Sequence, residues 1–171
     1  MEFINEQLTV KELPKVEDVN LQPLQSRYLD SLLIQYGIIA LIILAGLGAA
    51  IIFVPLMRTT FWLLSCLLIW LLIFLPGWWL EVRSFHYKGY AIRDKDVIFR
   101  SGWIVQQTTG CPFNRIQHCS VSSGPIDRRY GLATLRIYTA SSDGDLAIPG
   151  LLEEDAFAIK AFITKKIVTD E

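Results

Sequence analysis

The chain has 171 residues, of which 52% are hydrophobic and 19% are charged, and its formal net charge is −1. Two apolar stretches take up about a quarter of this length, so the remainder holds one small soluble domain and several such domains are excluded. The charges are unevenly distributed along the chain. Residues 81–142 carry nine basic and four acidic groups, whereas residues 143–171 carry three basic and seven acidic groups. Two interpretations stay open: ordinary scattered surface charge, or a basic face that meets anionic lipid headgroups or an acidic partner.

Residues 1–33 are polar and too few to hold a hydrophobic core. Six acidic and three basic groups lie within residues 1–30. We expect an N-terminal segment without a core of its own. Its acidic groups are candidates to dock onto the basic sheet of the same or a neighbouring chain.

The two apolar stretches, residues 37–55 and 61–79, are 19 residues each and carry no charge. A helix rises about 1.5 Å per residue, so each stretch spans roughly 28 Å, close to the ~30 Å hydrocarbon core of a bilayer. Neither stretch has a polar face, as a core helix would. Met57–Thr60 separates them and is long enough for a tight reversal. The pattern therefore predicts a transmembrane hairpin over residues 34–80.

Small residues cluster in the first stretch, where Ala45/Ala49 and Gly46/Ala50 form small-xxx-small pairs. Such pairs let helix backbones approach closely. They pack either against the second span of the same chain or between chains, and both interpretations stay open. Pro76–Gly77 is expected to kink or end the second helix. No acidic, basic or histidine side chain lies inside either span, which argues against an ion or proton pathway.

The flanking charges predict the orientation. The connecting loop carries Arg58 alone, whereas several cations follow the second span: Arg83, Lys88, Arg93, Lys95 and Arg100. The positive-inside rule therefore places both termini and the soluble domain in the cytoplasm. Trp62 at one end of the hairpin and Trp78 and Trp79 at the other suit the aromatic belts of the two membrane interfaces.

Residues 83–171 are predicted to form β-structure followed by a helix. The expected strands are residues 84–92, 97–101, 103–109, 116–122, 135–140 and 145–148, with a helical turn at 126–130. Short strands with close turns favour an antiparallel meander. From Leu152 the apolar spacing becomes helical, and these residues share one face: Leu152, Ala156, Ile159, Ile163 and Ile167. This terminal helix is expected to close one end of the sheet.

Motifs for catalysis or metal binding are missing from the sequence. Cys111 and Cys119 lie eight residues apart beside His118, which is not a zinc-binding spacing, and Cys66 lies within the second span. No nucleophile motif, glycine-rich phosphate loop or HExxH motif is present. We therefore expect buried reduced thiols, no metal, no cofactor, no enzymatic activity and no nucleic-acid partner.

Several short motifs together resemble the YdbS-like family of bacterial membrane proteins with PH-like domains. The motifs are Leu13-Pro14, Tyr28, Pro112-x-x-Arg115-Ile116-Gln117, Gly124–Arg129, Gly131–Leu135 and Ile148–Leu151. The resemblance implies an α+β membrane protein in which a two-helix hairpin precedes a PH-like antiparallel sheet or barrel capped by a C-terminal helix. It also implies the bacterial inner membrane, and a complex with a larger membrane protein that carries the same domain.

Six cations are candidates for binding lipid or a partner: Lys88, Arg93, Arg100, Arg115, Arg128 and Arg129. Lys88, Arg93 and Arg100 are expected to attract anionic lipid in a general way, whereas the other three serve as salt-bridged scaffold groups or as binding groups. Inositol-lipid binding is not expected, because two carboxylates in the first hairpin, Arg93–Asp96, repel a phosphate.

Two functions stay open. The first is a membrane-held interaction or scaffold module that assembles with itself or with a related PH-domain membrane protein. The second is a sensor in envelope homeostasis that binds a lipid or a small ligand.

Overall fold

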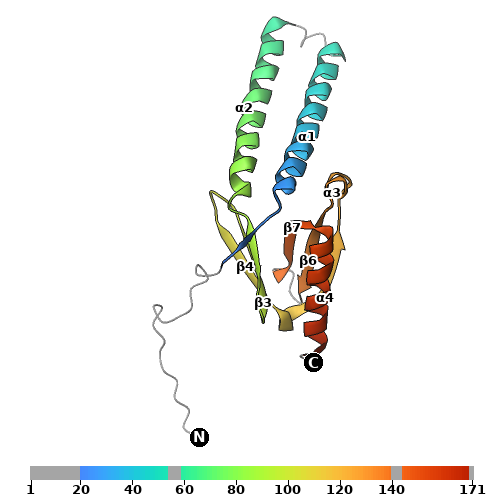
Figure 1. Cartoon of the computed structure of the whole chain (residues 1–171). Coiled ribbons are helices and arrows are strands. Elements are labelled where there is room, and N and C mark those ends of the chain that lie inside the picture. Colours follow the sequence, from blue (N-terminus) through green and yellow to red (C-terminus); the bar gives the residue numbers. More distant parts are fainter. Residues whose placement is uncertain (1–19, 54–58, 140–143, 170–171) are drawn as a thin grey trace, which may run out of the picture.

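The computed structural model describes residues 20–53, 59–139 and 144–169. Leu13-Pro14, Arg58 and most of the acidic N-terminal segment lie outside the described residues. The elements follow in this order: β1 (Gln22–Pro23), α1 (Ser26–Phe53), α2 (Thr60–Phe85), β2 (Gly89–Ile92), β3 (Asp96–Ser101), β4 (Gln107–Pro112), η3 (Phe113–Arg115), β5 (Ile116–Ser122), α3 (Pro125–Arg129), β6 (Leu132–Thr139), β7 (Leu146–Leu152) and α4 (Glu153–Thr169). This order confirms the predicted α+β class, with two long apolar helices before antiparallel strands and a terminal helix (Figure 1).

The helices α1 and α2 have 28 and 26 residues, enough to cross a bilayer. They stand side by side and project from one end of the β-domain (Figure 1). The most apolar part of each helix is not enclosed by the rest of the chain. A soluble protein would bury such surface, so the helices are the membrane-spanning part of the protein.

Aromatic side chains join the two helices in their domain-proximal halves. The Tyr36 ring lies 5.6 Å from the Phe74 ring and 6.2 Å from the Trp78 ring. The Tyr36 hydroxyl donates to the Phe74 carbonyl at 3.2 Å, and the Trp70 indole donates to the Ala40 carbonyl at the same distance. Both bonds reach a backbone carbonyl of the other helix, so they fix the register of the hairpin as well as its spacing.

Pro76–Gly77 was expected to kink or end the second helix, and of these two outcomes the ending is wrong, since α2 continues through both residues to Phe85. Proline within a transmembrane helix is tolerated where neighbouring groups satisfy the freed backbone. Gly77 has a separate role: a Cβ added there would lie 2.1 Å from the Tyr36 hydroxyl oxygen. The glycine therefore provides the space that Tyr36 occupies.

Gly77→Ala is expected to displace Tyr36 and to lower the melting temperature of the protein in mild detergent. Its matched control is Gly37→Ala, where an added Cβ meets nothing within 4 Å. Alanine favours a helix over glycine by about 1 kcal/mol, so the control should be neutral or slightly stabilising. A Gly77→Ala melting curve equal to that of the control would contradict this account of the hairpin.

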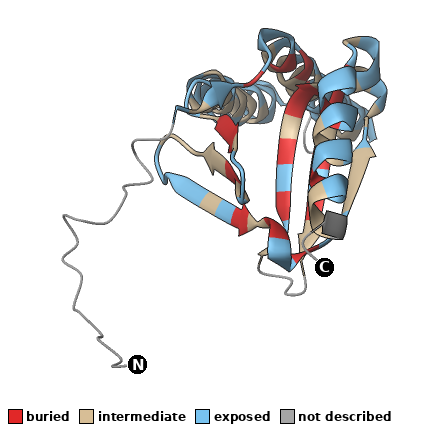
Figure 2. Cartoon of the chain, turned by 60° about the horizontal axis from the view of Figure 1, so that its bottom comes forward, coloured by how far each residue is buried: buried red, intermediate tan, exposed pale blue. Residues whose placement is uncertain are grey.

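Over its described residues, the β-domain forms two antiparallel sheets, with strand orders β1-β2-β3-β4 and β5-β6-β7. Buried and more exposed residues alternate over part of β6 and of β7 in the second sheet (Figure 2), whereas β2 and β3 of the first sheet contain consecutive buried residues. The core combines residues from both sheets and α4, including the fully buried Leu135, Ile148 and Ile163. On α4, Ala156 and Ile163 are completely buried and Ile159 and Ile167 pack against the core, which confirms the predicted apolar face.

Two predicted strands begin too early. The strand expected at residues 84–92 is limited to Gly89–Ile92, because α2 continues to Phe85, which packs against the core. The strand expected at residues 103–109 begins at Gln107, because Gly102 adopts a φ of +94° and turns the chain. Such a φ favours glycine, which has no Cβ to clash.

Residues before the first predicted span belong to the domain core. β1 pairs with β2, and the side chains of Leu24 and Tyr28 are buried in the main hydrophobic cluster. The helix α1 begins at Ser26, so its first two turns lie against the domain rather than in the apolar span. The hydropathy pattern did not indicate this.

Candidate functional site at the junction and on the first sheet

The first contact between helix α1 and the domain joins Tyr28 to Gly150. Gly150 lies in β7 with a φ of +69°, and a Cβ there would lie 2.4 Å from Cγ of Tyr28. The backbone N–H of Gln25 donates a hydrogen bond to the backbone carbonyl of Gly150 at 3.3 Å. The Tyr28 ring also lies 6.4 Å from the ring of Phe85 at the end of α2. One aromatic side chain therefore contacts both helices and the second sheet.

The second contact is polar and joins α1 to α3. The Ser31 hydroxyl donates to the Asp127 carboxylate at 2.5 Å, and the Gln35 amide reaches the same oxygen at 3.3 Å and the Ser31 hydroxyl oxygen at 3.0 Å. Ser31 is completely buried. A buried hydroxyl without a partner costs about 1–3 kcal/mol, so Asp127 holds α3 against this face of α1.

These contacts bring together residues that the sequence analysis grouped by resemblance alone. Tyr28, the Gly124–Arg129 motif and the Ile148–Leu151 motif are far apart in the chain and meet at the junction. Their shared role is positional, since they fix the angle between the spans and the domain. The hairpin is therefore packed onto the domain and is not a loose tether.

Gly150→Ala is expected to destabilise the junction for two reasons. A non-glycine residue in the left-handed region costs about 1–2 kcal/mol, and crowding against Tyr28 adds about 1–3 kcal/mol. Gly131→Ala is the control, because Gly131 has a φ of +67° but open space around an added Cβ. Chemical denaturation in detergent should show the larger loss for Gly150→Ala. Equal losses would mean that the Tyr28 contact contributes nothing.

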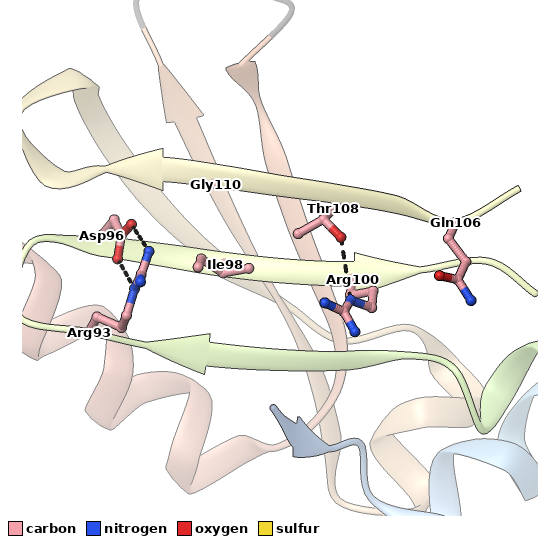
Figure 3. A pocket seen from close by; sticks show the side chains of 7 residues that line it. All are labelled: Arg93, Asp96, Ile98, Arg100, Gln106, Thr108 and Gly110. Atoms are coloured by element: carbon pink, nitrogen blue, oxygen red, sulfur yellow. Dashed lines mark hydrogen bonds and ion pairs between the residues drawn. The ribbon is translucent and has the colours of Figure 1, made fainter. Parts of the chain in front are cut away.

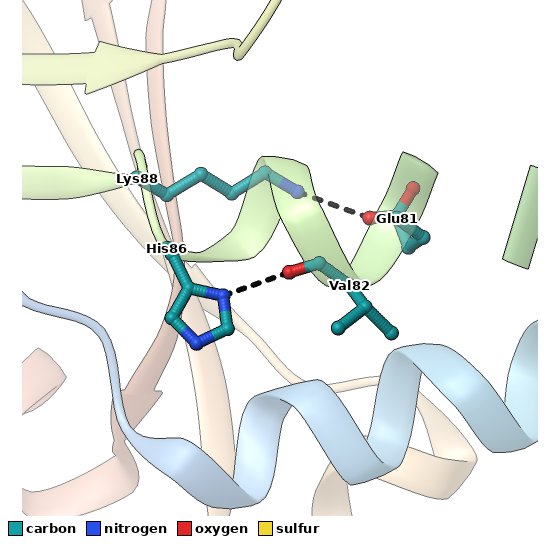
Figure 4. A network of polar contacts seen from close by, with 4 residues as sticks. All are labelled: Glu81, Val82, His86 and Lys88. Atoms are coloured by element: carbon teal, nitrogen blue, oxygen red, sulfur yellow. Dashed lines mark hydrogen bonds and ion pairs between the residues drawn. The ribbon is translucent and has the colours of Figure 1, made fainter. Parts of the chain in front are cut away.

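The predicted cations fall into separate groups. Arg128 and Arg129 are exposed on α3, at the end of the domain that carries the helices (Figure 1). Lys88 lies just after α2 and forms an ion pair with Glu81 at 3.1 Å (Figure 4). Beside it, Nδ1 of His86 lies 2.9 Å from the Val82 carbonyl oxygen. Arg115 is exposed on η3, which follows the far end of β4.

Arg93 and Arg100 lie at two ends of an open hollow on the outer face of the first sheet (Figure 3). Its volume is about 570 Å³, and its lining is Arg93, Asp96, Ile98, Arg100, Gln106, Thr108 and Gly110. Alternation along the strands explains the set, because residues 96, 98 and 100 of β3 share one face and Gly110 and Thr108 of β4 lie opposite Ile98 and Arg100.

The two arginines of the hollow differ in their partners. Nε of Arg93 donates to Oδ1 of Asp96 at 2.6 Å, and this hydrogen bond raises the pKa of Arg93. Nε of Arg100 lies 3.4 Å from the Thr108 hydroxyl, and no described acidic side chain forms an ion pair with it. Ile98, only 2% exposed, lies between them. The hollow therefore offers one cation, Arg100, that forms no ion pair with a described acidic side chain, whereas Ile98 exposes almost none of its surface there.

Sequence reasoning found both arginines but missed Ile98, Gln106, Thr108 and Gly110. Alternate residues of a strand lie on the same face of the sheet, and this rule identifies the lining residues only once the pairing of β3 with β4 is known. The strand predicted at residues 103–109 begins four residues before β4, so its bounds did not supply that register.

The thiols and histidines do not form a metal site among the described residues. Cys66, Cys111 and Cys119 are free, and Cys111 is buried. Burial raises the pKa of Cys111 and raises that of Cys119 to about 11. The His118 ring stacks on its cross-strand neighbour Tyr138 at 4.4 Å. Both thiols therefore remain protonated near neutral pH.

The small residues of α1 do not pack against α2. Ala45, Gly46 and Ala49 are exposed, Ala50 is half-buried, and a Cβ on Gly46 would meet nothing within 4 Å. Between the helices lies an apolar hollow of about 270 Å³, whose α1 lining includes Ala40 and Leu44. At about 100° per residue, Gly46 lies roughly 200° around the helix from Leu44. The small-residue face therefore points away from the partner helix of the hairpin.

Comparison with known proteins gives a consistent result. A family model described as a bacterial PH domain matches residues 19–167. The chain is 32% identical over 83 residues to the UPF0699 transmembrane protein YdbS of Bacillus subtilis strain 168. The aligned segment covers 48% of this chain and 51% of that protein. The match thus spans about half the length of the relative. No solved structure matches the chain.

Proposed function

The chain belongs to the bacterial PH domain family, and on this premise we propose a non-enzymatic, membrane-anchored interaction module. In this proposal the protein assembles with itself or with a related membrane protein that carries the same domain. The spans lie in the bacterial inner membrane, and both termini and the domain face the cytoplasm, as the flanking lysines and arginines predict.

The exposed small-residue face of α1 is the observation that carries the proposal. Lipid tails are as apolar as leucine, so helices in a membrane associate through close packing rather than through the hydrophobic effect. Gly46 and Ala50 allow close approach, and the contacts of α1 with α2 use other residues. This face is therefore free to pack against a span of another chain.

The junction supports the same proposal. Because Tyr28 and Ser31 hold α1 against the domain, two chains that pack through α1 would also hold their domains in a defined arrangement. The exposed Arg128 and Arg129 would then lie close to the membrane, where anionic headgroups attract them.

Assembly is tested by the mass of the full chain in mild detergent and in lipid nanodiscs. We expect a complex larger than one chain, and a shift towards the single chain when Gly46→Leu and Ala50→Leu are combined. Leu68→Phe, at an exposed position on α2, is the control and should leave the mass unchanged. A single-chain mass for the unaltered protein, alone and after co-expression with a related PH-domain membrane protein, would refute the proposal.

The hollow at Arg100 favours a second candidate function, a sensor that binds an anionic lipid or a small anionic ligand. Short-chain phosphatidylglycerol should raise the melting temperature of the full chain, because a ligand that binds only the folded state stabilises it. Arg100→Ala should remove the rise, whereas Arg115→Ala, an exposed cation outside the hollow, should keep it. Equal rises in both variants would exclude the hollow as the binding site.

A further inference from the structure

The turn between β3 and β4 presents an apolar tip, residues 103–105, to its surroundings. The side chains of Ile104 and Val105 are 76% and 78% exposed, compared with 52% for Phe157 on α4. Trp103 precedes them, so three large apolar residues follow one another in the chain. Consecutive exposed apolar residues on a folded domain mark a contact surface rather than ordinary scatter.

The tip lies beside the end of α2. β2 begins four residues after α2 ends, and the pairing of Gly89 with Arg100 brings the end of β3 back to that point. Figure 1 shows the start of β4 next to the domain-proximal end of α2. The Trp103 ring lies 5.3 Å from the Trp79 ring at an angle of 88°, an edge-to-face contact. This contact fixes the height of the tip relative to the spans.

The backbone holds the tip in one shape. Gly102 has a φ of +94°, and a Cβ there would lie 1.9 Å from the Val105 carbonyl oxygen. The turn is therefore tight, and it requires glycine at position 102 because any side chain there would clash with the backbone of Val105. Polar residues follow at its base, where Gln106 is exposed and Arg100 contacts Thr108.

The surroundings identify the occupant as lipid. Trp79 belongs to a membrane-spanning helix, and the guanidinium carbon of Arg83 lies 5.5 Å from its ring centre. Tryptophan with a neighbouring cation is typical of the membrane interface, where an amphipathic ring meets headgroups. A tip held at the height of Trp79, with apolar side chains outward and a polar base, matches the pattern of an interfacial anchor.

We propose that Trp103, Ile104 and Val105 insert into the interface of the same bilayer that α1 and α2 span. The domain then contacts the membrane at a third point and cannot tilt freely about the hairpin. The hollow that begins at Arg100 and Gln106 opens next to the headgroup layer as a result. This inference is independent of assembly and goes beyond the proposed function.

The test places an environment-sensitive fluorophore at Ile104→Cys in the full chain, reconstituted in phosphatidylcholine–phosphatidylglycerol vesicles with and without doxyl-labelled lipid. Asp94→Cys is the matched control, because it lies in the turn at the opposite end of β3. Cys66→Ala removes the thiol in α2. Cys111 and Cys119 stay, since Cys111 is buried, Cys119 is half-buried, and burial raises the pKa of both thiols so that they remain protonated near neutral pH.

At Ile104 we expect a blue-shifted emission, a loss of emission with doxyl lipid and protection from aqueous iodide. At Asp94 we expect the reverse. Val105→Cys should behave like Ile104→Cys and serves as a second probe if the first variant does not fold. Iodide quenching at both tip positions, or protection from iodide without doxyl quenching, would overturn the proposal; the second result would mean that a protein surface covers the tip.

Discussion

The packing of Tyr28 on Gly150 is the contact on which the rest of the structure depends. It joins the first turn of α1 to β7, and the same ring lies near Phe85 at the end of α2. With the buried Ser31–Asp127 hydrogen bond, it makes the two helices continuous with the domain core. Because α1 is packed onto the domain in this way, a rotation of α1 would rotate the domain with it. Because this junction joins the helices to the domain core, the proposed contacts between spans and between the domain and lipid would affect one another.

Three features of the domain surface lie at the end of the domain that carries the helices. The exposed Arg128 and Arg129, the apolar tip at residues 103–105 and the start of the hollow at Arg100 all lie towards the helix-bearing end of the domain. Lys88 and Arg93 have carboxylate partners, so their charges are compensated locally. Within residues 81–142, described cations that form no such ion pair include Arg100, Arg128 and Arg129. Their attraction to anionic lipid would reinforce the contact made by the spans.

Much of the fold could be predicted from local pattern. The hairpin followed from two uncharged stretches, and the apolar face of α4 followed from the spacing of Ala156 and Ile163, which are both fully buried. The predicted strand 116–122 matches β5. The predicted strand start at residue 84 was wrong because α2 continues to Phe85, which packs against the domain core. The predicted start at residue 103 was wrong because Gly102 turns the chain before β4 begins. The candidate site was predicted only in part, since Arg93 and Arg100 were named but the residues between them depend on strand register.

By itself, the sequence determined the membrane-spanning hairpin, the α+β class and the terminal helix, because hydropathy and periodicity are properties of single segments. The tertiary structure alone decided that Ser31 meets Asp127 across 96 positions, and that Trp103 meets Trp79. It also decided that Gly46 faces away from α2. Each of these features depends on how segments far apart in the chain pack against one another. Local composition carries no record of that packing, so the junction and the membrane-facing tip became evident only in the folded protein.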